Sequence, residues 1–406
     1  MKKRGKNLED IQISNRSLVI RMILRQENLS RLELANKTGL KQATITNIIN
    51  DLLECSLVSE TGYIEDNSRG RRMMGLGINT QDFRIVCVRL TRENFVAGVY
   101  DLRARELYKK RVCIDSNGDV EKAIKLIKNV ISECIEETVG KIVLGIGAAI
   151  PGPFVKSDHH FALVTGFPEL KNINLQKILS EEFDVPVYVE HDANAAAFAE
   201  WESMHCRNGL TEDEGNLLCV MPGQGVGAGI IIDGKVVRGQ LGIAGEIGHM
   251  SIDYAGPRCE CGNRGCLEKY ACTSAILEFM KQNLSKYDDT CLHSGSTIQE
   301  LSSAFENGDP LAILTITHWA EFLGYGIANL VNVLNPDTIV IGDDVPRNEM
   351  FLKIVKETVR KRVLEEIYDK LDIRLSLFND DVTLIGSCYM VVEKAVNTLS
   401  FIKMKQ

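Results

Sequence analysis

The hydrophobic pattern changes once along this chain, and that change limits what its 406 residues can fold into. In the first 60 residues the apolar positions recur at helical spacing, as in 15–27 and 41–54. From about residue 84 onward, short apolar runs of strand length alternate with longer helical ones. A chain of this length has room for two or three domains. We therefore predict a small helical unit followed by a larger α/β body.

The helical segment has the spacing of a helix-turn-helix motif. Ser30 and Glu33 form a capping box that starts a short helix. Gly39 supplies the positive φ of the turn that ends this helix. Ala35 is small enough for two helices to cross closely, and Ile45 of the next helix fills the core between them.

A hairpin with a basic tip is expected after these helices. Two short strands are predicted at 57–58 and 63–64, around a turn at 61–62. Residues 68–72 then place three arginines around a glycine, and such a tip can lie in a narrow minor groove of DNA. These features predict a winged helix-turn-helix DNA-binding domain over residues 1–78.

The side chains expected to contact DNA lie at the start of the third helix and in the basic tip. Polar residues at the start of a helix in the major groove reach phosphates and base edges. The candidates are Lys41, Gln42, Thr44, Thr46, Asn47, Arg69, Arg71 and Arg72. The competing interpretation is a generic three-helix packing module followed by a solvated basic linker.

The charge distribution agrees weakly with a nucleic-acid partner for the N-terminal end alone. Residues 1–76 hold 13 basic and 9 acidic residues, a net charge of +4. The remaining residues hold 34 basic and 46 acidic ones, a net charge of −12. A basic end on an acidic body indicates that only this end meets an acidic partner.

The rest of the chain makes two successive passes of strands followed by helices. The first pass has predicted strands at 84–90, 95–101, 106–114, 142–149 and 185–190, with helices at 120–137 and from residue 192. The second pass has strands at 217–221, 228–233, 338–342 and 373–377. This order predicts two similar α/β halves, although no repeat of residue identity is visible.

Three of the twelve cysteines lie within eight residues and predict a metal site. Cys259, Cys261 and Cys266 stand on a glycine-supported loop, and tetrahedral zinc needs a fourth ligand. His249, ten residues before Cys259, is the best candidate. Three thiolates and one imidazole indicate a closed, structural Zn²⁺ site rather than a catalytic one. Chance clustering of free cysteines is the alternative.

The other features of the sequence favour a cytoplasmic protein. The start of the chain is charged and lacks the apolar core of a secretory signal. The longest apolar stretch, 311–334, is interrupted by His318 and Glu321, so we expect no transmembrane helix. Nine cysteines are scattered singly, mostly among apolar residues, which suits free thiols in a reducing compartment.

The chain resembles the ROK family, named for repressors, open reading frames and kinases. Glu246-x-Gly-His249 followed by Cys-x-Cys-Gly-x-x-Gly-Cys-x-Glu268 carries the resemblance. The segments 192–197, 223–229 and 335–342 are similar to further family motifs. The N-terminal helices indicate the transcriptional-repressor branch, which includes xylose and N-acetylglucosamine repressors. The family fold implies an actin-like body over 79–406, made of two ribonuclease-H-like lobes with a zinc loop near 249–268.

The resemblance also implies a sugar site in the cleft between the lobes. In sugar-binding relatives the matching residues hold hydroxyl groups, and here they are Asp192, Glu246, His249 and Glu268. His249 can give one ring nitrogen to zinc and the other to a hydroxyl. His191 stands where the family usually has Asn, and Gly166 takes the place of a sugar-contacting Asn. These two departures leave the identity of the sugar, and whether one binds, open.

Two elements of the family's ATP site are altered. The strand that ends in Asp-x-Gly-Gly-Thr in the kinases has Arg89 in place of its acid. Asp343 and Asp344 replace a pair of glycines at the adenosine end, adding negative charge beside an anionic nucleotide. The glycine-rich segment 223–229 is interpreted as a tight strand-to-strand turn. We therefore expect no kinase activity.

The resemblance and the altered motifs predict a sugar-responsive repressor that binds operator DNA as a homodimer or homotetramer and does not bind membranes. An ATP-dependent sugar kinase with an added DNA-binding domain is the alternative from a different class. A regulator that is controlled by a protein partner, or that binds DNA constitutively, is a third possibility. Asp192, Glu246 and Glu268 also have purely structural interpretations as a helix cap, a turn cap and a partner of the loop backbone.

Overall fold

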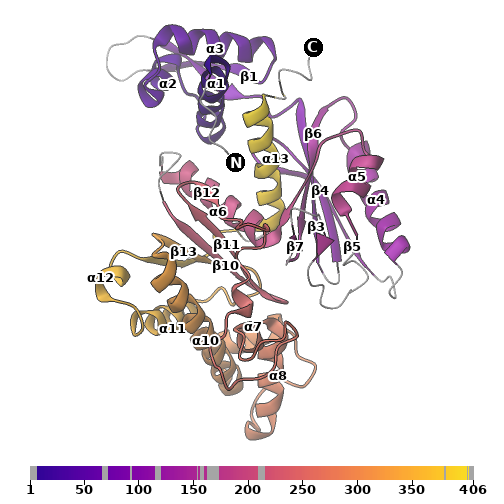
Figure 1. The fold of residues 1–406 in the computed structure, drawn as a ribbon, viewed down its shortest axis with the longest axis vertical. Helices are drawn as coiled ribbons and strands as arrows, with labels where there is room; N and C mark the ends of the chain where they lie inside the picture. Colours follow the sequence, from indigo (N-terminus) through magenta and orange to yellow (C-terminus); the bar gives the residue numbers. More distant parts are fainter. Residues whose placement is uncertain are drawn as a thin grey trace.

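The structure is a computed structural model that describes residues 7–65, 72–91, 94–114, 120–152, 154–155, 160–161, 173–208, 215–378, 381–399 and 401. Gly166, Arg69 and Arg71 lie outside these residues. Arg72 begins a strand, but its side chain is not described. The chain forms a small N-terminal unit above two α/β lobes (Figure 1).

Three helices open the N-terminal unit: α1 (Leu8–Arg25), α2 (Arg31–Thr38) and α3 (Gln42–Glu54). The capping box of Ser30 and Glu33 is confirmed, and Gly39 ends α2 with φ 69°. Ile45 is fully buried between the helices, as expected. Helix α1 begins earlier than its apolar pattern indicated, because Asn7 and Asp10 form a second capping box.

The hairpin of this unit differs from the sequence-based expectation. Two short strands around a turn at 61–62 were expected, and this is wrong. One strand, β1 (Val58–Glu65), runs through these residues and pairs with β2 (Arg72–Ile78). Gly62, with φ 106°, forms a β-bulge between Glu60 and Gly62 instead of a turn, so the strand continues. The basic tip thus falls between β1 and β2.

Lobe 1 is built on a five-stranded sheet with the order β5-β4-β3-β6-β9. The first pairings, β3 with β4 and β4 with β5, are antiparallel, and β3–β6 and β6–β9 are parallel. Two helices cover one face with an apolar cluster. The elements are β3 (Phe83–Leu90), β4 (Asn94–Tyr100), β5 (Glu106–Cys113), α4 (Val120–Glu136), β6 (Ile142–Ile150), α5 (Leu175–Glu182) and β9 (Val187–His191), with the short pair β7 (Phe154–Val155) and β8 (His160–Phe161).

Lobe 2 repeats this topology. Its sheet has the order β12-β11-β10-β13-β14, with two antiparallel pairings followed by two parallel ones. Both sheets therefore have the same order and sense, which confirms two similar halves. The strands are β10 (Leu217–Pro222), β11 (Val226–Ile232), β12 (Lys235–Val236), β13 (Thr338–Ile341) and β14 (Asp372–Leu375).

Helices cover the far face of the second sheet and form the largest apolar core. They are α7 (Glu268–Ala271), α8 (Thr273–Asn283), α9 (Ile298–Glu306), α10 (Pro310–Leu334), α11 (Glu349–Arg360) and α12 (Glu365–Tyr368), with short 3₁₀ turns at Ile247–His249 and Leu284–Lys286. Within the described residues α10 is the one helix long and apolar enough to cross a membrane. Its most apolar 18-residue stretch is 61% buried inside the protein. It packs here as a core helix, with Trp319 fully buried.

Two helices lie between the lobes, α6 (Asp192–Asn208) and α13 (Val382–Thr398). Helix α6 packs on β10 and β11, and α13 packs on β3 and β6. The two helices also pack on each other, and Gly386 is required at their crossing. A Cβ at Gly386 would lie 1.8 Å from the carbonyl oxygen of Ala195. Figure 1 shows α13 running from beneath the N-terminal unit down between the two lobes.

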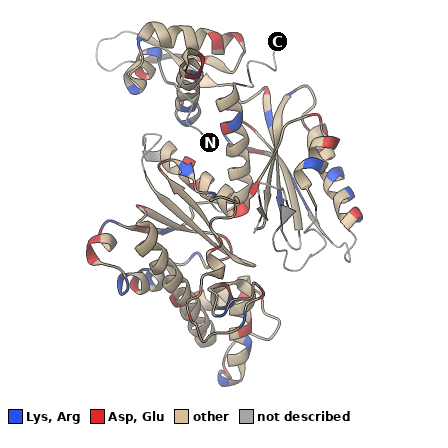
Figure 2. Cartoon of the chain, viewed as in Figure 1, with Lys and Arg blue, Asp and Glu red and all other residues tan. Residues whose placement is uncertain are grey.

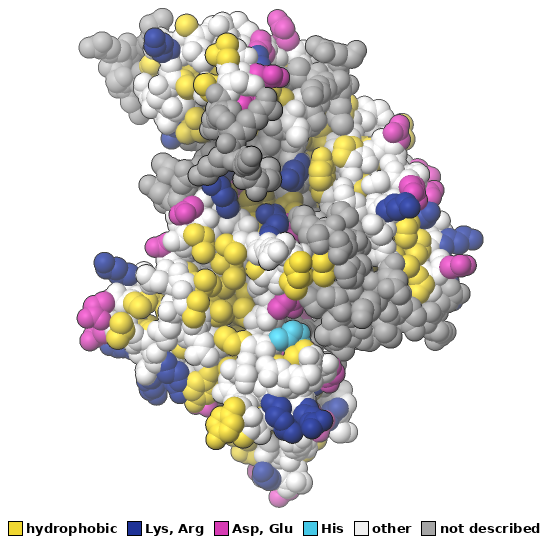
Figure 3. All heavy atoms as spheres, in the orientation of Figure 1, with side chains coloured by type: hydrophobic (Ala, Val, Ile, Leu, Met, Phe, Trp, Pro, Cys, Tyr) yellow, Lys and Arg dark blue, Asp and Glu magenta, His cyan; other side chains and the backbone are white. Residues whose placement is uncertain are grey.

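Charged side chains decorate outer helices such as α4 and α12, whereas the strands of the second sheet carry little charge (Figure 2). On the face shown in Figure 3, apolar side chains gather over β10–β12. Acidic and histidine side chains reach the surface beside each other at the junction of the two lobes (Figure 3).

Candidate functional site: the cleft between the lobes

A cleft of about 370 Å³ lies where the two lobes meet. It is placed at the ends of equivalent strands, because β3 and β6 of lobe 1 and their counterparts β10 and β13 of lobe 2 all end beside it. Five of the six expected sugar-site residues line it together: His191, Asp192, Glu246, His249 and Glu268. Arg89, Asp343 and Asp344 line it as well.

His191 and Asp192 sit at the junction of β9 and α6. His191 is the last residue of β9 and is 6% exposed, and its Nε2 lies 3.2 Å from Oδ1 of Asp192. Asp192 begins α6, and its Oδ1 also accepts a hydrogen bond from the backbone N–H of Ala193 at 2.7 Å. The Asp192 side chain is 28% exposed, so it is held at the helix start while remaining open to the cleft.

Glu246 approaches the same imidazole from the other lobe. Its Oε1 lies 4.0 Å from Nε2 of His191 and is buried, with no hydrogen-bond partner among the described residues. Burial raises the pKa of Glu246; the two histidines His191 and His249 oppose this shift, and Asp192 and Glu268 add to it. A buried acceptor that lacks a donor can accept a hydrogen bond from a hydroxyl group of a ligand.

Glu268 closes this side of the cleft at the start of α7. Its Oε2 accepts a hydrogen bond at 3.3 Å from the backbone N–H of Val226, the first residue of β11. The backbone of Gly225 passes so close that a Cβ there would lie 2.9 Å from Oε2. The glycine-rich segment 223–229 itself forms the tight antiparallel turn of β10 and β11, which confirms its interpretation.

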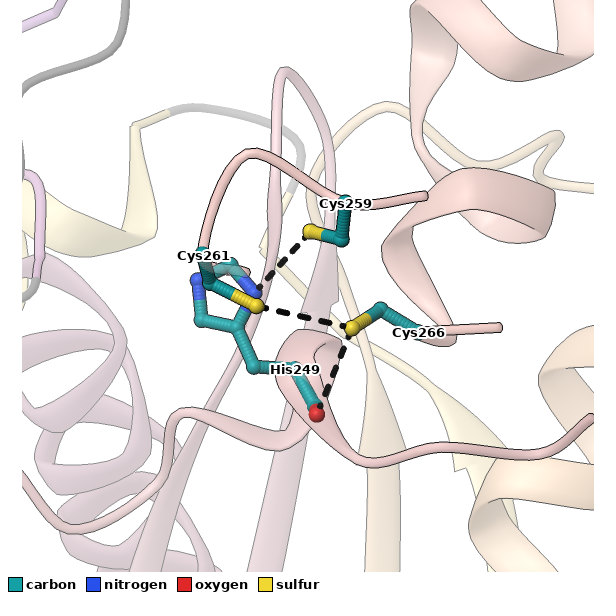
Figure 4. A group of neighbouring side chains, drawn as sticks. All are labelled: His249, Cys259, Cys261 and Cys266. Carbon is teal, nitrogen blue, oxygen red and sulfur yellow. Dashed lines mark hydrogen bonds between the residues drawn. The ribbon is translucent and has the colours of Figure 1, made fainter. Parts of the chain in front are cut away.

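His249, Cys259, Cys261 and Cys266 form one cluster next to the cleft. Their ligand atoms all lie within 4.8 Å of one another. Nδ1 of His249 is 3.7 Å from Sγ of Cys259, and Sγ of Cys261 is 3.7 Å from Sγ of Cys266 (Figure 4). Ligands bound tetrahedrally at about 2.0–2.3 Å stand ~3.3–3.8 Å apart. The cluster therefore has the donor set and the spacing for a metal ion of the zinc type.

The loop that carries the cysteines is held by its own backbone. The N–H of Cys259 donates to the carbonyl of Asn263 at 2.9 Å, and Ser251 pairs with Cys266. Gly265 has φ 61°, and a Cβ there would lie 1.7 Å from the carbonyl oxygen of Asp253. Because Nδ1 of His249 faces the sulfur atoms, its Nε2 is the nitrogen left for the cleft.

The opposite corner of the cleft is filled by an ion-pair network around Arg89 at the end of β3. One terminal nitrogen of its guanidinium lies 2.9 Å from Oδ1 of Asp381, and the other lies 3.5 Å from Oδ1 of Asp343. Asp381 directly precedes α13, and Asp343 directly follows β13 and Gly342. Arg89 and Asp343, which were expected to differ from the ATP motifs of the family's kinases, therefore pair with each other.

Asp343 has a backbone conformation that glycine adopts more readily than other residues. Its φ is 62°, in the left-handed region, which Asp tolerates better than most residues. Its carboxylate lies over the loop of β10 and β11, since a Cβ on Gly223 would be 2.4 Å from its Oδ2. Asp344 accepts a hydrogen bond from Oγ1 of Thr273 at 3.3 Å.

Sequence reasoning missed Asp381, together with Asn94, Arg111 and Thr383 of the cleft wall. Asp381 is nearly 300 positions from Arg89, and no local pattern joins the two. The available signal was an acid just before the last helix, which the two-lobed fold places at the cleft.

The expected DNA-contacting residues lie together on the first turns of α3. Lys41 is the N-cap of this helix. Lys41, Gln42, Thr46 and Asn47 are exposed, whereas Thr44 is half-buried. These side chains share the outer side of the helix start, opposite the buried Ile45, Ile48 and Ile49.

Comparisons with known proteins agree with this arrangement. A model of the ROK family matches residues 85–394. The chain is 30% identical over 400 residues to a xylose repressor of Caldicellulosiruptor bescii, covering 93% of this chain and 95% of that protein. The crystal structure of a ROK family transcriptional regulator, a homolog of the Escherichia coli Mlc protein, matches with a TM-score of 0.80 and 27% identity. That match covers 98% of this chain and 99% of the other.

A solved kinase matches only the body. The ROK glucokinase of Streptomyces griseus, in complex with glucose and AMPPNP, has a TM-score of 0.66 and 25% identity. It covers 76% of this chain and 98% of its own length, so the kinase has no counterpart for about a quarter of this chain. Similarity over nearly the full length is thus found with named repressors of sugar metabolism. The chain belongs to the ROK family, and its relatives of matching length are transcriptional repressors.

Proposed function

We propose that this chain is a DNA-binding transcriptional repressor of carbohydrate metabolism, with a cleft that binds a sugar or sugar derivative and does not bind ATP. The ion-pair network of Arg89, Asp343 and Asp381 carries the proposal. It stands in the corner to which the family resemblance assigns the ATP site of the kinases. Asp343 and Asp344 add carboxylates there that repel phosphate groups.

The N-terminal unit, residues 1–78, is the DNA-binding domain in this proposal, and residues 79–406 are the effector-binding body. The exposed start of α3 enters the major groove through Lys41, Gln42, Thr44, Thr46 and Asn47. Arg69, Arg71 and Arg72 of the basic tip reach an adjacent minor groove. An inverted-repeat operator would be bound by a dimer or a tetramer of the cytoplasmic protein.

The sugar hydroxyls are held by Asp192, Glu246, Glu268 and the free Nε2 of His249. Each carboxylate can accept hydrogen bonds from two vicinal hydroxyls. The buried Oε1 of Glu246, which has no donor among the described residues, supports this assignment. His191, wedged between Asp192 and Glu246, alters the pattern that the family's Asn would offer. Gly166 is expected to complete the site.

A structural Zn²⁺ held by His249, Cys259, Cys261 and Cys266 would fix this side of the cleft. The ion would neutralise the thiolates and set the tautomer of His249, leaving Nε2 as the nitrogen that meets a hydroxyl. It would take no part in chemistry, because four protein ligands leave no open position on a tetrahedral ion.

Fluorescence anisotropy with DNA from upstream of the chain's own gene tests the proposal. The titration is run at fixed salt concentration, because phosphate contacts make affinity salt-dependent. Xylose, N-acetylglucosamine and their phosphates are then added. We expect tight binding that one of these compounds changes by tenfold or more, which corresponds to about 1.4 kcal/mol of coupling. Binding that no compound changes would contradict the effector part of the proposal.

Matched variants locate the DNA surface. Lys41→Ala and Asn47→Ala are each expected to weaken operator binding by about 10-fold or more, as loss of a phosphate or base contact does. Lys281→Ala, an exposed lysine on α8 of the far lobe, is the control and should bind DNA normally. If all three variants bind the operator with the same affinity, α3 is not part of the DNA interface.

The kinase alternative rests on Asp192, which matches the family's general base, and on the likeness to the glucokinase. A coupled phosphorylation assay on the same sugars with ATP and Mg²⁺ tests it. We expect no turnover. Turnover of a few per second or more, in the range of ordinary enzymes, would establish the kinase instead.

A further inference from the structure

Helices α6 and α13 both begin in the cleft and both end against the N-terminal unit. Asp192, the first residue of α6, lines the cleft, and Asp381, directly before α13, is bonded to Arg89 there. Through Arg89 this end of α13 is also joined to Asp343 of lobe 2. A ligand in the cleft, or a shift of one lobe against the other, would therefore act directly on both helix starts.

At their far ends the two helices hold α1 through two arginines that are one helical turn apart. Arg25 donates to both carboxylate oxygens of Glu202 on α6, at 3.0 and 2.9 Å. Arg21 donates to both oxygens of Glu393 on α13, at 3.0 and 2.8 Å. Ser17 adds a buried hydrogen bond to the carbonyl of Val396 at 3.0 Å.

These contacts fix the orientation of α1 more strongly than ordinary surface ion pairs do. Bidentate pairs between arginine and a carboxylate restrict the angle as well as the distance. The side chains of Arg25 and Glu202 are only 14% and 13% exposed, so water screens them weakly. The guanidinium of Arg25 also lies 5.5 Å from the ring centroid of Trp201 on α6.

The two helices between these ends form one stiff element. The contact of Gly386 with the carbonyl of Ala195 brings their backbones together, and apolar side chains of both helices join one buried cluster. From Asp192 to Glu202 is about 15 Å along a helix, and from Asp381 to Glu393 about 18 Å, at 1.5 Å per residue. Closely packed helices move as bodies and do not bend to absorb a shift at one end.

We propose that α6 and α13 act as a paired strut that transmits the state of the cleft to the DNA-binding unit, through Glu202 with Arg25 and Glu393 with Arg21. The inference rests on the proposed function and deepens it, since it names how that site regulates DNA binding. A shift of the helix starts moves the two glutamates together and so reorients α1, with α2 and α3 packed on it. Glu202 and Glu393 are positioning residues in this mechanism.

Hydrogen exchange of the full, metal-replete chain without DNA or sugar tests the strut. Arg89→Ala removes the contact with Asp381 that holds the start of α13 in the cleft. We expect the backbone amides of residues 17–25 in α1 to exchange about threefold faster or more than in the parent chain. Arg362→Ala is the matched control. It removes an arginine that stacks on Tyr325 at 3.9 Å in the far lobe, and it should leave α1 unchanged.

The same substitution in a second background separates transmission from general loosening. In a chain with Glu202→Gln and Glu393→Gln the α1 amides already exchange faster, and Arg89→Ala should add no further increase there. If Arg89→Ala affects α1 no more than Arg362→Ala does, or if its full effect persists in the Gln background, the strut is wrong.

A milder variant keeps the test decisive if Arg89→Ala does not fold. Asp381→Asn cuts only the link from Arg89 to α13 and leaves Asp343 in place, and the same criteria apply to it. Because no operator or sugar is used, a negative result counts against the strut alone. Failure of operator binding in the anisotropy titration counts against the proposed function.

Discussion

The two sides of the cleft treat their polar groups in opposite ways. On the side of Asp192, Glu246 and Glu268 the acceptors retain unused capacity, and Oε1 of Glu246 is buried with no donor among the described residues. On the side of Arg89 the charged groups are paired with one another, since Asp343 and Asp381 both contact terminal nitrogens of the same guanidinium, although its Nε is buried without a partner among the described residues. In the proposed function the first side receives sugar hydroxyls, and the second is occupied by the chain's own charged side chains.

Under the proposed function, this difference would let a kinase-like cleft bind a sugar without binding a nucleotide. A nucleotide bound between two lobes can join them, because its phosphate groups interact with side chains of both. Here Arg89 of lobe 1 forms an ion pair directly with Asp343 of lobe 2, so the lobes are joined without a phosphate. The sugar side needs no such replacement, because its residues are supported by the cysteine loop and by the start of α6.

The largest expected effect is that of removing the metal that supports the sugar side. Chelation, or Cys266→Ser, should lower the free energy of unfolding by several kcal/mol, because apparent binding energies of structural zinc reach ~10 kcal/mol. Calorimetry with elemental analysis measures this, and Cys291→Ser, an exposed cysteine outside the cluster, is the control. If protein prepared with excess zinc contains none, the proposed metal site is wrong.

Opening the closed side should cost less but still be large. Arg89→Ala leaves Asp343 and Asp381 without a counter-charge, and breaking a mostly buried pair costs about 3 kcal/mol. Urea unfolding measures the change. Adding Asp343→Asn and Asp381→Asn to Arg89→Ala should recover part of the loss, since no unpaired charge then remains. No recovery would mean that Arg89 matters for its packing and not for its charge.

The sequence allowed most of the scaffold to be predicted. Local signals were sufficient for α2, α3 and the longer strands of both lobes, since capping residues and apolar runs act over a few neighbours. The two-residue strands β7, β8 and β12 were not predicted. The hairpin was mispredicted because a glycine in a polar stretch fits a turn and a β-bulge equally well, and the bulge is what forms at Gly62. The start of α1 was missed because a capping box, not an apolar residue, opens it.

In the candidate site, too, local features could be predicted and long-range contacts could not. The cysteine loop and His249 are close in sequence, so spacing alone was enough to group them. Arg89, Asp343 and Asp381 come from three distant strand and helix ends. Two of them were singled out as departures from a family motif, but their mutual pairing depends on the tertiary fold. The link from the cleft to α1 through Glu202 and Glu393 had no sequence signal.

A smaller effect distinguishes the ligand-binding side from the closed side. Asp192→Asn should weaken binding of the effector sugar by about 10–100-fold, because a hydrogen bond to a charged acceptor contributes about 1.5–3 kcal/mol. The free energy of unfolding should change little, since the partly exposed Asp192 has few fixed partners. Asp344→Asn, across the cleft, is the matched control, and titration calorimetry measures both. Equal loss in the two variants would contradict the division of the cleft into two sides.

The smallest expected effect is a pH dependence of the closed side. Burial raises the pKa of Asp343 to about 7 from an ordinary value of 3.8, although Arg89 opposes this. The folded chain therefore holds this proton at pH values where the unfolded chain has lost it. The stability that the proton contributes is complete below the unfolded pKa and is lost as the pH rises toward 7. Urea unfolding at pH 6 and pH 7 should show a loss about 1 kcal/mol larger in the parent chain than in Asp343→Asn. Other titrating groups are common to both chains and cancel in the difference. Equal pH slopes would show that Arg89 keeps Asp343 ionised, and that the pair joining the two lobes is fully charged throughout this range.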